Sequence, residues 1–178
     1  MSAKMGSNIE TLLESDPYTL TKNEKDVIFL NSMKEAVSFH YEKSKEFRKI
    51  CDNRGFTQTK NFSVEEIPFL PVSLFKKFKL KSVPDSEIFK TVYSSATTSD
   101  LPSTIFLDRI TSERQTRVLI SIMKNFLTEK KDFLIVDQDS SMNTLPDIKS
   151  RSSAIRGFFP FMKSIKFGLD NSLKLDER

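Results

Sequence analysis

Several residue types are scarce in this sequence of 178 residues, and each scarcity excludes a class of protein. Cys51 is the one cysteine, which excludes an internal disulfide framework and a thiolate metal cluster, so we expect a reducing, cytoplasmic setting. The N-terminus has no apolar h-region, and no stretch approaches the roughly 20 apolar residues of a membrane span. The sequence therefore predicts neither export nor insertion into a membrane.

The composition is that of a soluble globular protein, with 38% hydrophobic and 29% charged residues. Tryptophan is absent, and 16 phenylalanines indicate a core built largely on that residue. The net charge is +4, and the 28 basic residues are mixed with 24 acidic ones rather than gathered in one run. We therefore expect no nucleic-acid partner. The tightest basic group, residues 76 to 81 (KKFKLK), predicts a strand with a solvated lysine face or a surface for an anion.

Helical signals fill the N-terminal region, residues 1 to 60. SNIETLLES predicts a short helix that ends before Asp16. Thr21 and Glu24 form a capping-box pattern ahead of apolar residues spaced by three and four, which predicts a helix over residues 22 to 43. The helical pattern continues or restarts until Gly55 stops it.

The remaining residues, 61 to 178, read as an α/β portion. Pro68 and Pro71 indicate a packed connection instead of a regular helix. Strands are predicted over residues 80–82, 88–93, 104–108, 166–169 and 173–175, with a buried parallel strand within 132–141. Helices are predicted over 111–127 and up to Gly157 or Phe159. The fold class is α/β, a mixed sheet flanked by helices, and we expect residues 1–178 to form a single partial domain.

A dense cluster of hydroxyl residues lies between two of these strands, in YSSATTSDLPS. Its members are Ser94, Ser95, Thr97, Thr98 and Ser99. A turn needs one or two such residues, whereas a loop of short hydroxyl side chains can wrap a phosphate with its backbone and side-chain donors. A Walker P-loop is excluded, because the glycine spacing and the lysine before Ser/Thr are missing. A phosphate loop and an ordinary hydroxyl-rich turn both remain open.

Single residues elsewhere could also carry chemistry. His40 is the one histidine, so any Ser/His/Asp triad would need it, although a lone helical histidine beside Phe39 is usually structural. Cys51 has no second cysteine or nearby histidine to activate it, which favours an inert thiol. Each therefore has a catalytic and a structural interpretation.

Charged residues in the C-terminal third form two further candidates. Asp137 and Asp139 follow an apolar strand, where carboxylates meet ligands or magnesium in many α/β proteins, although they could equally lie in a solvated loop. Arg151 and Arg156 in RSSAIRGF could clamp an anion.

The order of segments resembles a known family. Four segments resemble, in sequence and in order, the N-terminal half of LuxE-type acyl-protein synthetases, which belong to the adenylate-forming superfamily. These segments are IPFLPVSLFKKFKLKSV, VYSSATTSDLPSTIFLD, ERQTRVLISIMKNFL and DFLIVD. The resemblance runs from about Asn23 to Leu169. It implies the N-terminal part of an acyl-CoA synthetase-like fold.

The resemblance also implies an activity. Family members use ATP and Mg²⁺ to activate a carboxylic acid, typically a fatty acid, as acyl-adenylate, and pass the acyl group to a cysteine and on to an acyl reductase or acyl-carrier partner. The loop that matches Ser94, Ser95, Ala96, Thr97, Thr98 and Ser99 would hold the ATP phosphates. Ala96 stands where the family usually has glycine, and Cys51 does not match the family's acceptor cysteine. The alternative is a non-catalytic binding or interaction module that retains the fold.

Overall fold

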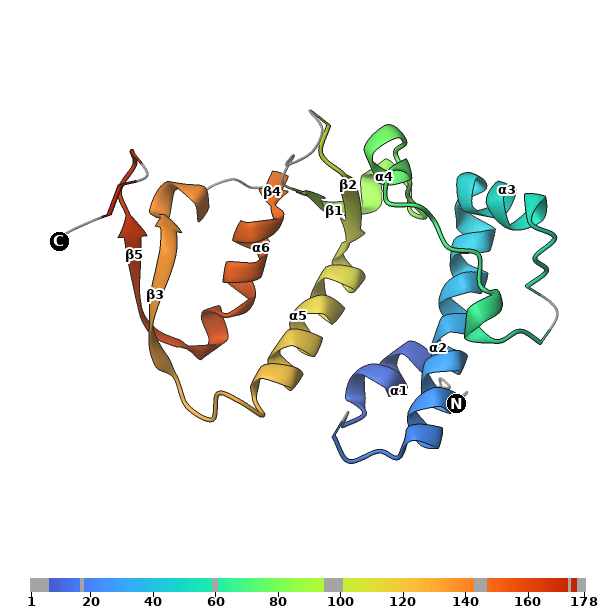
Figure 1. Cartoon of the computed structure of the whole chain (residues 1–178), viewed down its shortest axis with the longest axis horizontal. Helices are drawn as coiled ribbons and strands as arrows, with labels where there is room; N and C mark the ends of the chain where they lie inside the picture. The colour runs from blue at the N-terminus through green and yellow to red at the C-terminus, as the bar shows by residue number, and fades with distance from the viewer. Residues whose placement is uncertain are drawn as a thin grey trace. The chain divides into compact units, whose positions relative to one another are not determined.

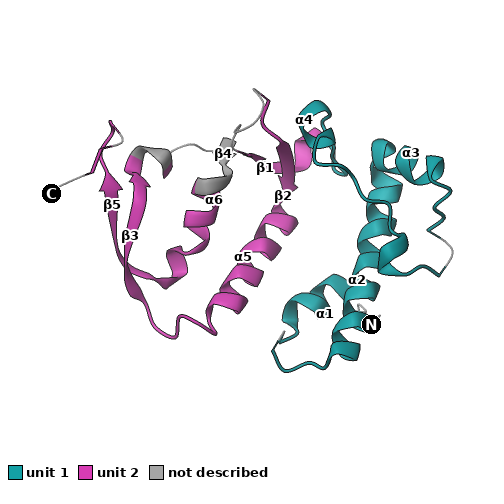
Figure 2. Cartoon of the chain, in the orientation of Figure 1, with its two compact units in different colours: residues 1–84 teal, residues 85–178 magenta. Residues whose placement is uncertain are grey.

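The structure is a computed structural model, and it describes residues 7–16, 18–58, 61–94, 101–142, 147–172 and 174–175. The chain divides into two compact units, residues 1–84 and 85–178, which Figure 2 shows in separate colours. The predicted boundary between a helical and an α/β region lay earlier, after residue 60. The expectation of a single partial domain stays a prediction.

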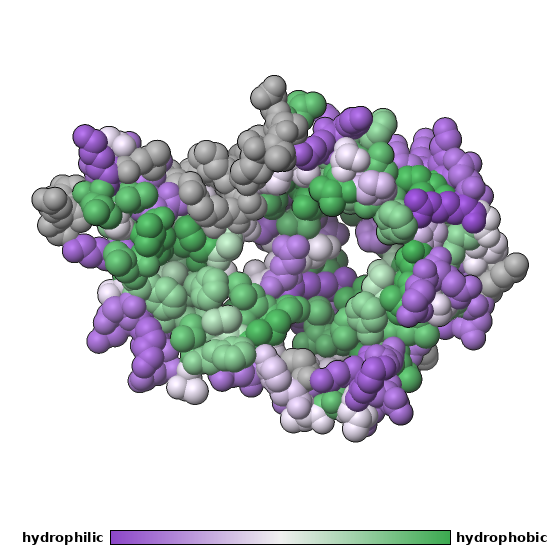
Figure 3. All heavy atoms as spheres, viewed as in Figure 1, coloured by the Kyte–Doolittle hydropathy of each residue, from purple (hydrophilic) through white to green (hydrophobic). Residues whose placement is uncertain are grey.

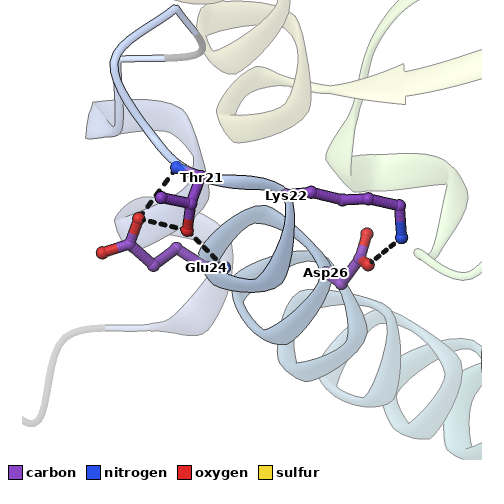
Figure 4. A network of polar contacts seen from close by, with 4 residues as sticks. All are labelled: Thr21, Lys22, Glu24 and Asp26. Carbon is purple, nitrogen blue, oxygen red and sulfur yellow. Dashed lines mark hydrogen bonds and ion pairs between the residues drawn. The ribbon is translucent and has the colours of Figure 1, made fainter.

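The first unit is built on the helices α1 (Asn8–Glu14), α2 (Lys22–Lys43) and α3 (Lys45–Asn53) (Figure 1). The predicted helix over residues 22 to 43 is confirmed, and so is its capping box. The Thr21 backbone N–H donates to Glu24 Oε2 at 2.8 Å, and the Glu24 N–H donates to Thr21 Oγ1 at 3.4 Å (Figure 4). Two backbone donors that would lack partners at the start of α2 are thereby satisfied.

Helix α1 is attached to α2 through polar groups. The side chain of Ser32 is buried and donates to the Asn8 carbonyl at 2.8 Å. Glu35 accepts from the Asn8 backbone N–H at 2.6 Å and from the Ser7 hydroxyl, and these bonds to the carboxylate hold its pKa below the ordinary value. A carboxylate at a helix N-terminus also matches the positive end of the helix dipole, so Glu35 fixes the start of α1.

The sequence predicted that the helical pattern either continues or restarts after residue 43, and it restarts at α3. Ser44 Oγ accepts from the Phe47 N–H at 3.3 Å and caps the new helix. Gly55 has φ +67°, a left-handed conformation that glycine adopts without strain, and it ends the helical segment as predicted. Cys51, on the inner face of α3, is fully buried.

The segment after α3 holds only short helical turns, η1 (Val64–Glu66), α4 (Leu74–Lys77) and η2 (Asp85–Glu87). The packed connection around Pro68 and Pro71 agrees with this arrangement. The predicted strand over residues 80–82 is wrong, and so is the strand expected for residues 76–81, since residues 78 to 84 form no regular element. Alternation of apolar and charged residues makes a strand only where another strand pairs with it, and no pairing in this segment is recorded among the described residues.

The second unit contains a mixed sheet of β1 (Ile88–Tyr93), β2 (Thr104–Asp108) and β4 (Asp147–Lys149) in the order β2-β1-β4. Strands β1 and β2 are antiparallel with Tyr93 opposite Thr104, and both have the predicted bounds. Strand β4, which the sequence did not predict, is parallel to β1 and pairs Tyr93 with Lys149. The expected mixed α/β sheet is confirmed.

Two helices pack on this sheet, α5 (Arg109–Met123) and α6 (Ser150–Gly157). Asp108 Oδ1 accepts from the Thr111 N–H at 2.6 Å and starts α5 two residues before the predicted position. The helix ends at Met123 instead of residue 127. Just beyond this end, the Asn125 side chain donates to the carbonyls of Ser121 and Ile122 at 3.1 and 3.3 Å. Helix α6 approaches α5 closely. This is seen at Gly157, where an added Cβ would lie 2.2 Å from Leu119 Cδ2.

The strands β3 (Lys131–Gln138) and β5 (Met162–Leu169) form a separate parallel pair, and the turns η3 (Asp139–Met142) and η4 (Phe159–Phe161) adjoin it. The β3 strand was expected to be buried, and this holds for one face only. Ile135 is 8% exposed, whereas Leu134 and Val136 are 66% and 73% exposed. Figure 3 shows apolar residues gathered over this part of the second unit. Leu169 forms an antiparallel bridge with Leu175, in line with the predicted C-terminal strand pair.

Candidate functional site

The hydroxyl loop is the connection of the β1–β2 hairpin. Its residues 95 to 100 lie outside the described part of the chain, so the predicted roles of Ser95, Ala96, Thr97, Thr98 and Ser99 stay predictions. The base of the loop is described at both ends. The Ser94 N–H donates to the Ser103 carbonyl at 3.1 Å, and the Ser103 N–H donates to Ser94 Oγ at 2.9 Å. The first bond continues the backbone ladder of the hairpin by one step beyond Tyr93, and the second joins the same two residues through the Ser94 side chain.

Ser94 therefore has a structural role. Its backbone N–H and one acceptor position of its hydroxyl are used within the hairpin, while its side chain stays exposed and keeps its O–H donor. Ser103, which sequence reasoning did not single out, is buried and closes the loop from the other side. The pair holds the two described ends of the loop next to each other.

The loop follows β1 at the end of the sheet where α/β proteins bind ligands. Strands β1 and β4 are parallel, and Tyr93 lies opposite Lys149, so both strands end at the same edge. The hydroxyl loop leaves this edge after Tyr93, and α6 begins there directly after Lys149. Ligands in α/β proteins bind beyond the carboxyl ends of parallel strands, and the free backbone N–H groups of a helix N-terminus attract anions.

The histidine and the cysteine have structural surroundings in the first unit. His40 Nδ1 lies 2.7 Å from Ser82 Oγ, and its ring meets those of Phe39 and Phe47 edge to face. Burial lowers the pKa of His40, so the neutral imidazole is favoured. Cys51 is 0% exposed, and burial raises the pKa of its thiol. A protonated, inaccessible thiol cannot act as a nucleophile.

The structure describes the side chains of three of the four charged residues singled out in the second unit, Asp137, Asp139 and Arg156. Asp137 is buried, and its Oδ1 accepts from the Gln138 N–H at 2.8 Å, whereas Asp139 is exposed. Within the described residues, no group of three or more metal-ligating side chains comes together. Arg156 donates from Nη2 to the Met142 carbonyl. The side chain of Arg151 lies outside the described part, so the predicted arginine clamp stays a prediction.

No helix among the described residues combines the length and the apolar character needed to cross a membrane. The basic segment at residues 76–81 leaves Lys77 and Lys79 exposed, and it is helical up to Lys77. Its interpretation as an anion surface stays a prediction.

Comparison with known proteins gives a consistent picture. The profile of the family described as acyl-protein synthetase, LuxE, matches residues 3–175. A long-chain-fatty-acid–luciferin-component ligase of Aliivibrio fischeri is 35% identical over 82 residues, which cover 46% of this chain and 21% of that protein. The protein of the same description from Vibrio harveyi is 26% identical over 121 residues, covering 64% of this chain and 32% of that protein. The matched segments thus span less than a third of the length of each of these relatives.

A solved structure shares the fold. A 2-hydroxyisobutyryl-CoA ligase, crystallised in an open conformation with 2-HIB-AMP and CoA, superposes with a TM-score of 0.60 at 15% sequence identity. The match covers 87% of this chain and 37% of the ligase chain. At this identity the likeness concerns the fold, and it confirms the expected acyl-CoA synthetase-like architecture.

Proposed function

Since the chain belongs to the acyl-protein synthetase family LuxE, we propose that it provides the ATP-phosphate-binding part of a ligase that activates a fatty acid. In this reaction the carboxylate oxygen of the acid attacks the α-phosphorus of ATP. The bond from that phosphorus to the bridging oxygen breaks, and the products are acyl-adenylate and pyrophosphate. A protein thiolate then attacks the acyl carbon, so that a thioester forms and AMP leaves.

One observation carries this proposal. The hydroxyl loop and the N-terminus of α6 leave the same edge of the sheet, beyond the paired residues Tyr93 and Lys149. Departure of pyrophosphate concentrates negative charge on the leaving oxygens, and donors already aimed at that charge lower the barrier. The hydroxyls of Ser95, Thr97, Thr98 and Ser99 would be those donors, together with the N–H groups of the loop and of the first turn of α6. The Ser94–Ser103 pair would hold the ends of the loop together.

The residues present fit ATP better than they fit a protein-held metal ion. No cluster of three carboxylates, histidines or cysteines occurs in the described ranges. A Mg²⁺ ion with few protein ligands is held mainly by phosphate oxygens and water. In this proposal the phosphates of the nucleotide would hold Mg²⁺, and the ion would supply neutralisation of part of their charge.

The acyl acceptor is a thiol other than Cys51. That residue is fully buried, and burial raises the pKa of its thiol, so neither access nor ionisation favours acylation. The proposal places the acceptor on another part of the ligase or on a partner, such as an acyl reductase or an acyl carrier. A cytoplasmic location suits both the nucleotide and a reduced thiol.

Binding of ATP to the 178-residue chain tests the proposal directly. We expect Ala96→Gly to tighten ATP binding, because glycine allows the backbone to approach a phosphate closely. Thr97→Ala and Thr98→Ala should each weaken binding, while Thr19→Ala, in an exposed turn of the first unit, should leave it unchanged. Isothermal titration of the natural chain and of the four variants, with ATP and with pyrophosphate, gives these affinities. Absence of binding by both the natural chain and Ala96→Gly would contradict the proposal.

Ala96 itself favours a second candidate, a non-catalytic module that keeps the fold. If the position needs positive φ, alanine strains the loop and weakens the phosphate site. Fatty-acid-dependent exchange of labelled pyrophosphate into ATP separates the candidates. Exchange supports the ligase, and ATP binding without exchange in the presence of fatty acid supports the module.

A further inference from the structure

Two turns of the second unit present exposed phenylalanines where the strands β3 and β5 begin. The parallel register pairs Lys131, the first residue of β3, with Met162, the first residue of β5. One turn leads from α5 into β3 and the other, η4, leads into β5, and Figure 1 shows both at the lower end of these strands. Phe126 on the first turn is 65% exposed, and Phe159 on the second is 42% exposed.

The turn η4 separates buried apolar side chains from an exposed one. In the run FFPFM, Phe161 and Met162 are buried, whereas Phe159 is exposed. The ring of Phe158 lies 6.3 Å from the ring of Phe133 in β3, measured between centroids. These neighbours attach the turn to β3 and leave Phe159 at the surface. A single exposed apolar side chain is ordinary, but two aromatic ones at the start of two paired strands indicate a contact surface.

The two turns also carry a net positive charge. Residues 124–131 and 159–163, which we call the Phe–Lys edge, contain no arginine and four exposed lysines, Lys124, Lys130, Lys131 and Lys163. Glu129 is the one acid in these two segments, and it forms an ion pair with Lys131. The next acid along the chain, Asp132, accepts from Ser164 Oγ at 2.6 Å. The edge therefore combines aromatic rings with an excess of cations.

The backbone of these turns finds hydrogen-bond partners within the chain. The Phe126 N–H donates to the Met123 carbonyl at 2.9 Å. Pro160 has no N–H group, and the Phe161 N–H donates to the Phe158 carbonyl at 2.9 Å. An unpaired N–H group would make transfer from water to an apolar phase costly. Because these groups are already paired or missing, the turns can approach such a phase at low cost.

We propose that the Phe–Lys edge binds the surface of an anionic phospholipid bilayer without spanning it. The rings of Phe126 and Phe159 enter the boundary between head groups and acyl chains, and the lysines lie at the level of the lipid phosphates. Apolar side chains at this boundary and cations beside anionic head groups both contribute to such binding. Lysine suits this position, because its aliphatic stem lies along apolar surface while its ammonium stays in water.

The composition of the edge favours a lipid surface over an acidic protein. Protein interfaces are enriched in arginine and depleted in lysine, whereas this edge has four lysines and no arginine. The site does not depend on the proposed ligase function, because it lies at the starts of β3 and β5 and the proposed phosphate site follows β1. Vesicle binding is measured without ATP, so failure of either proposal leaves the other intact.

Sedimentation of the 178-residue chain with vesicles measures the affinity. The probe is a vesicle of equal parts phosphatidylglycerol and phosphatidylcholine. Vesicles of phosphatidylcholine alone lack the net charge, and polyglutamate has negative charge without acyl chains. We expect saturable binding to the mixed vesicles and at least about tenfold weaker binding to the other two. Equal binding to both kinds of vesicle would overturn the proposal. Binding to polyglutamate but not to vesicles would also overturn it, in favour of an acidic protein partner.

The absence of tryptophan from the sequence makes contact with lipid directly measurable. Phe126→Trp and Phe159→Trp each add one fluorescent reporter to the edge. Val136→Trp is the matched control, because Val136 lies on the outer face of β3 and is 73% exposed. On mixed vesicles we expect the emission of both edge variants to shift to shorter wavelength and to be quenched by lipids brominated on their acyl chains. Equally strong quenching in Val136→Trp, or none in the edge variants, would refute the proposal.

A pair of charge variants separates the edge from net charge. Lys124→Gln combined with Lys163→Gln removes two lysines of the edge, and Lys77→Gln combined with Lys79→Gln removes two exposed lysines of the first unit. Each lysine near an anionic membrane contributes about fivefold in affinity, so the edge pair should weaken binding to mixed vesicles at least about tenfold. The control pair should leave it nearly unchanged. No loss from the edge pair, or equal losses from both pairs, would overturn the proposal.

Discussion

The contact between α5 and α6 gives a sharp prediction for Gly157→Ala. A Cβ at this position would lie 2.2 Å from Leu119 Cδ2, whereas carbon atoms in ordinary contact lie about 3.5 to 4 Å apart. Leu119 or the helix must therefore move by more than about 1 Å. Overpacking of this kind costs about 1 to 3 kcal/mol, and the better helix propensity of alanine offsets at most about 1 kcal/mol of it.

We expect Gly157→Ala to destabilise the second unit by about 1 to 2 kcal/mol, toward the lower value if the Leu119 side chain swings into a cavity that it lines. Gly168→Ala is the matched control, because its Cβ would meet Leu134 Cδ1 at 3.5 Å, an ordinary contact. Hydrogen exchange of the α5 and α6 amides, measured with increasing urea, confines the measurement to this unit.

A double-mutant cycle with Leu119→Ala isolates the clash. Removing the Leu119 side chain should make Gly157→Ala neutral or slightly stabilising, so the two changes should couple by at least about 1 kcal/mol. If Gly157→Ala is as stable as the natural chain and shows no coupling to Leu119→Ala, the close approach of the two helices is refuted.

Three further predictions concern helix starts and the histidine. Thr21→Ala removes the N-cap acceptor of α2 and should lower the free energy of unfolding of the first unit by about 1 kcal/mol in urea titrations followed by circular dichroism, whereas Thr19→Ala should not. Asp108→Ala should likewise cost about 1 kcal/mol and increase hydrogen exchange in the first turn of α5. The pKa of His40 is lowered in the folded chain, so the unfolded chain binds more protons below about pH 6.5 and the first unit should lose stability as the pH falls through that value. His40→Gln should flatten this dependence between pH 5 and 7; an unchanged slope would contradict it, because the lowered pKa of Glu24 and Glu35 acts only near and below about pH 4.5.

Features encoded by neighbouring residues were predictable from the sequence. The start of α2 follows from Thr21 and Glu24, which satisfy backbone donors within one turn. The two hairpin strands are bounded by the hydroxyl cluster, and both were predicted with their observed bounds. Such signals need no information about distant parts of the chain.

Features that depend on distant partners were missed or wrong. Strand β4 has three residues and no periodicity of its own, and it exists because β1 offers an edge to pair with. The alternating residues 80–82 show the converse, because they have the pattern of a strand and no recorded partner. The hydroxyl cluster was recognisable from its own composition. The position of Tyr93 opposite Lys149, just before α6, and the approach of Lys90 and Arg156 to one cavity arise only from the folded chain.

The burial of Cys51 makes the protein its own unfolding reporter. A thiol reagent cannot reach a side chain that is 0% exposed until α3 opens, so the rate of labelling measures how often that opening occurs. The sequence has one cysteine, and it lies in the first unit, so the reaction has no background from the second. A single chemical modification, followed by mass spectrometry, therefore distinguishes a substitution that loosens the helical unit from one that loosens the sheet-bearing unit.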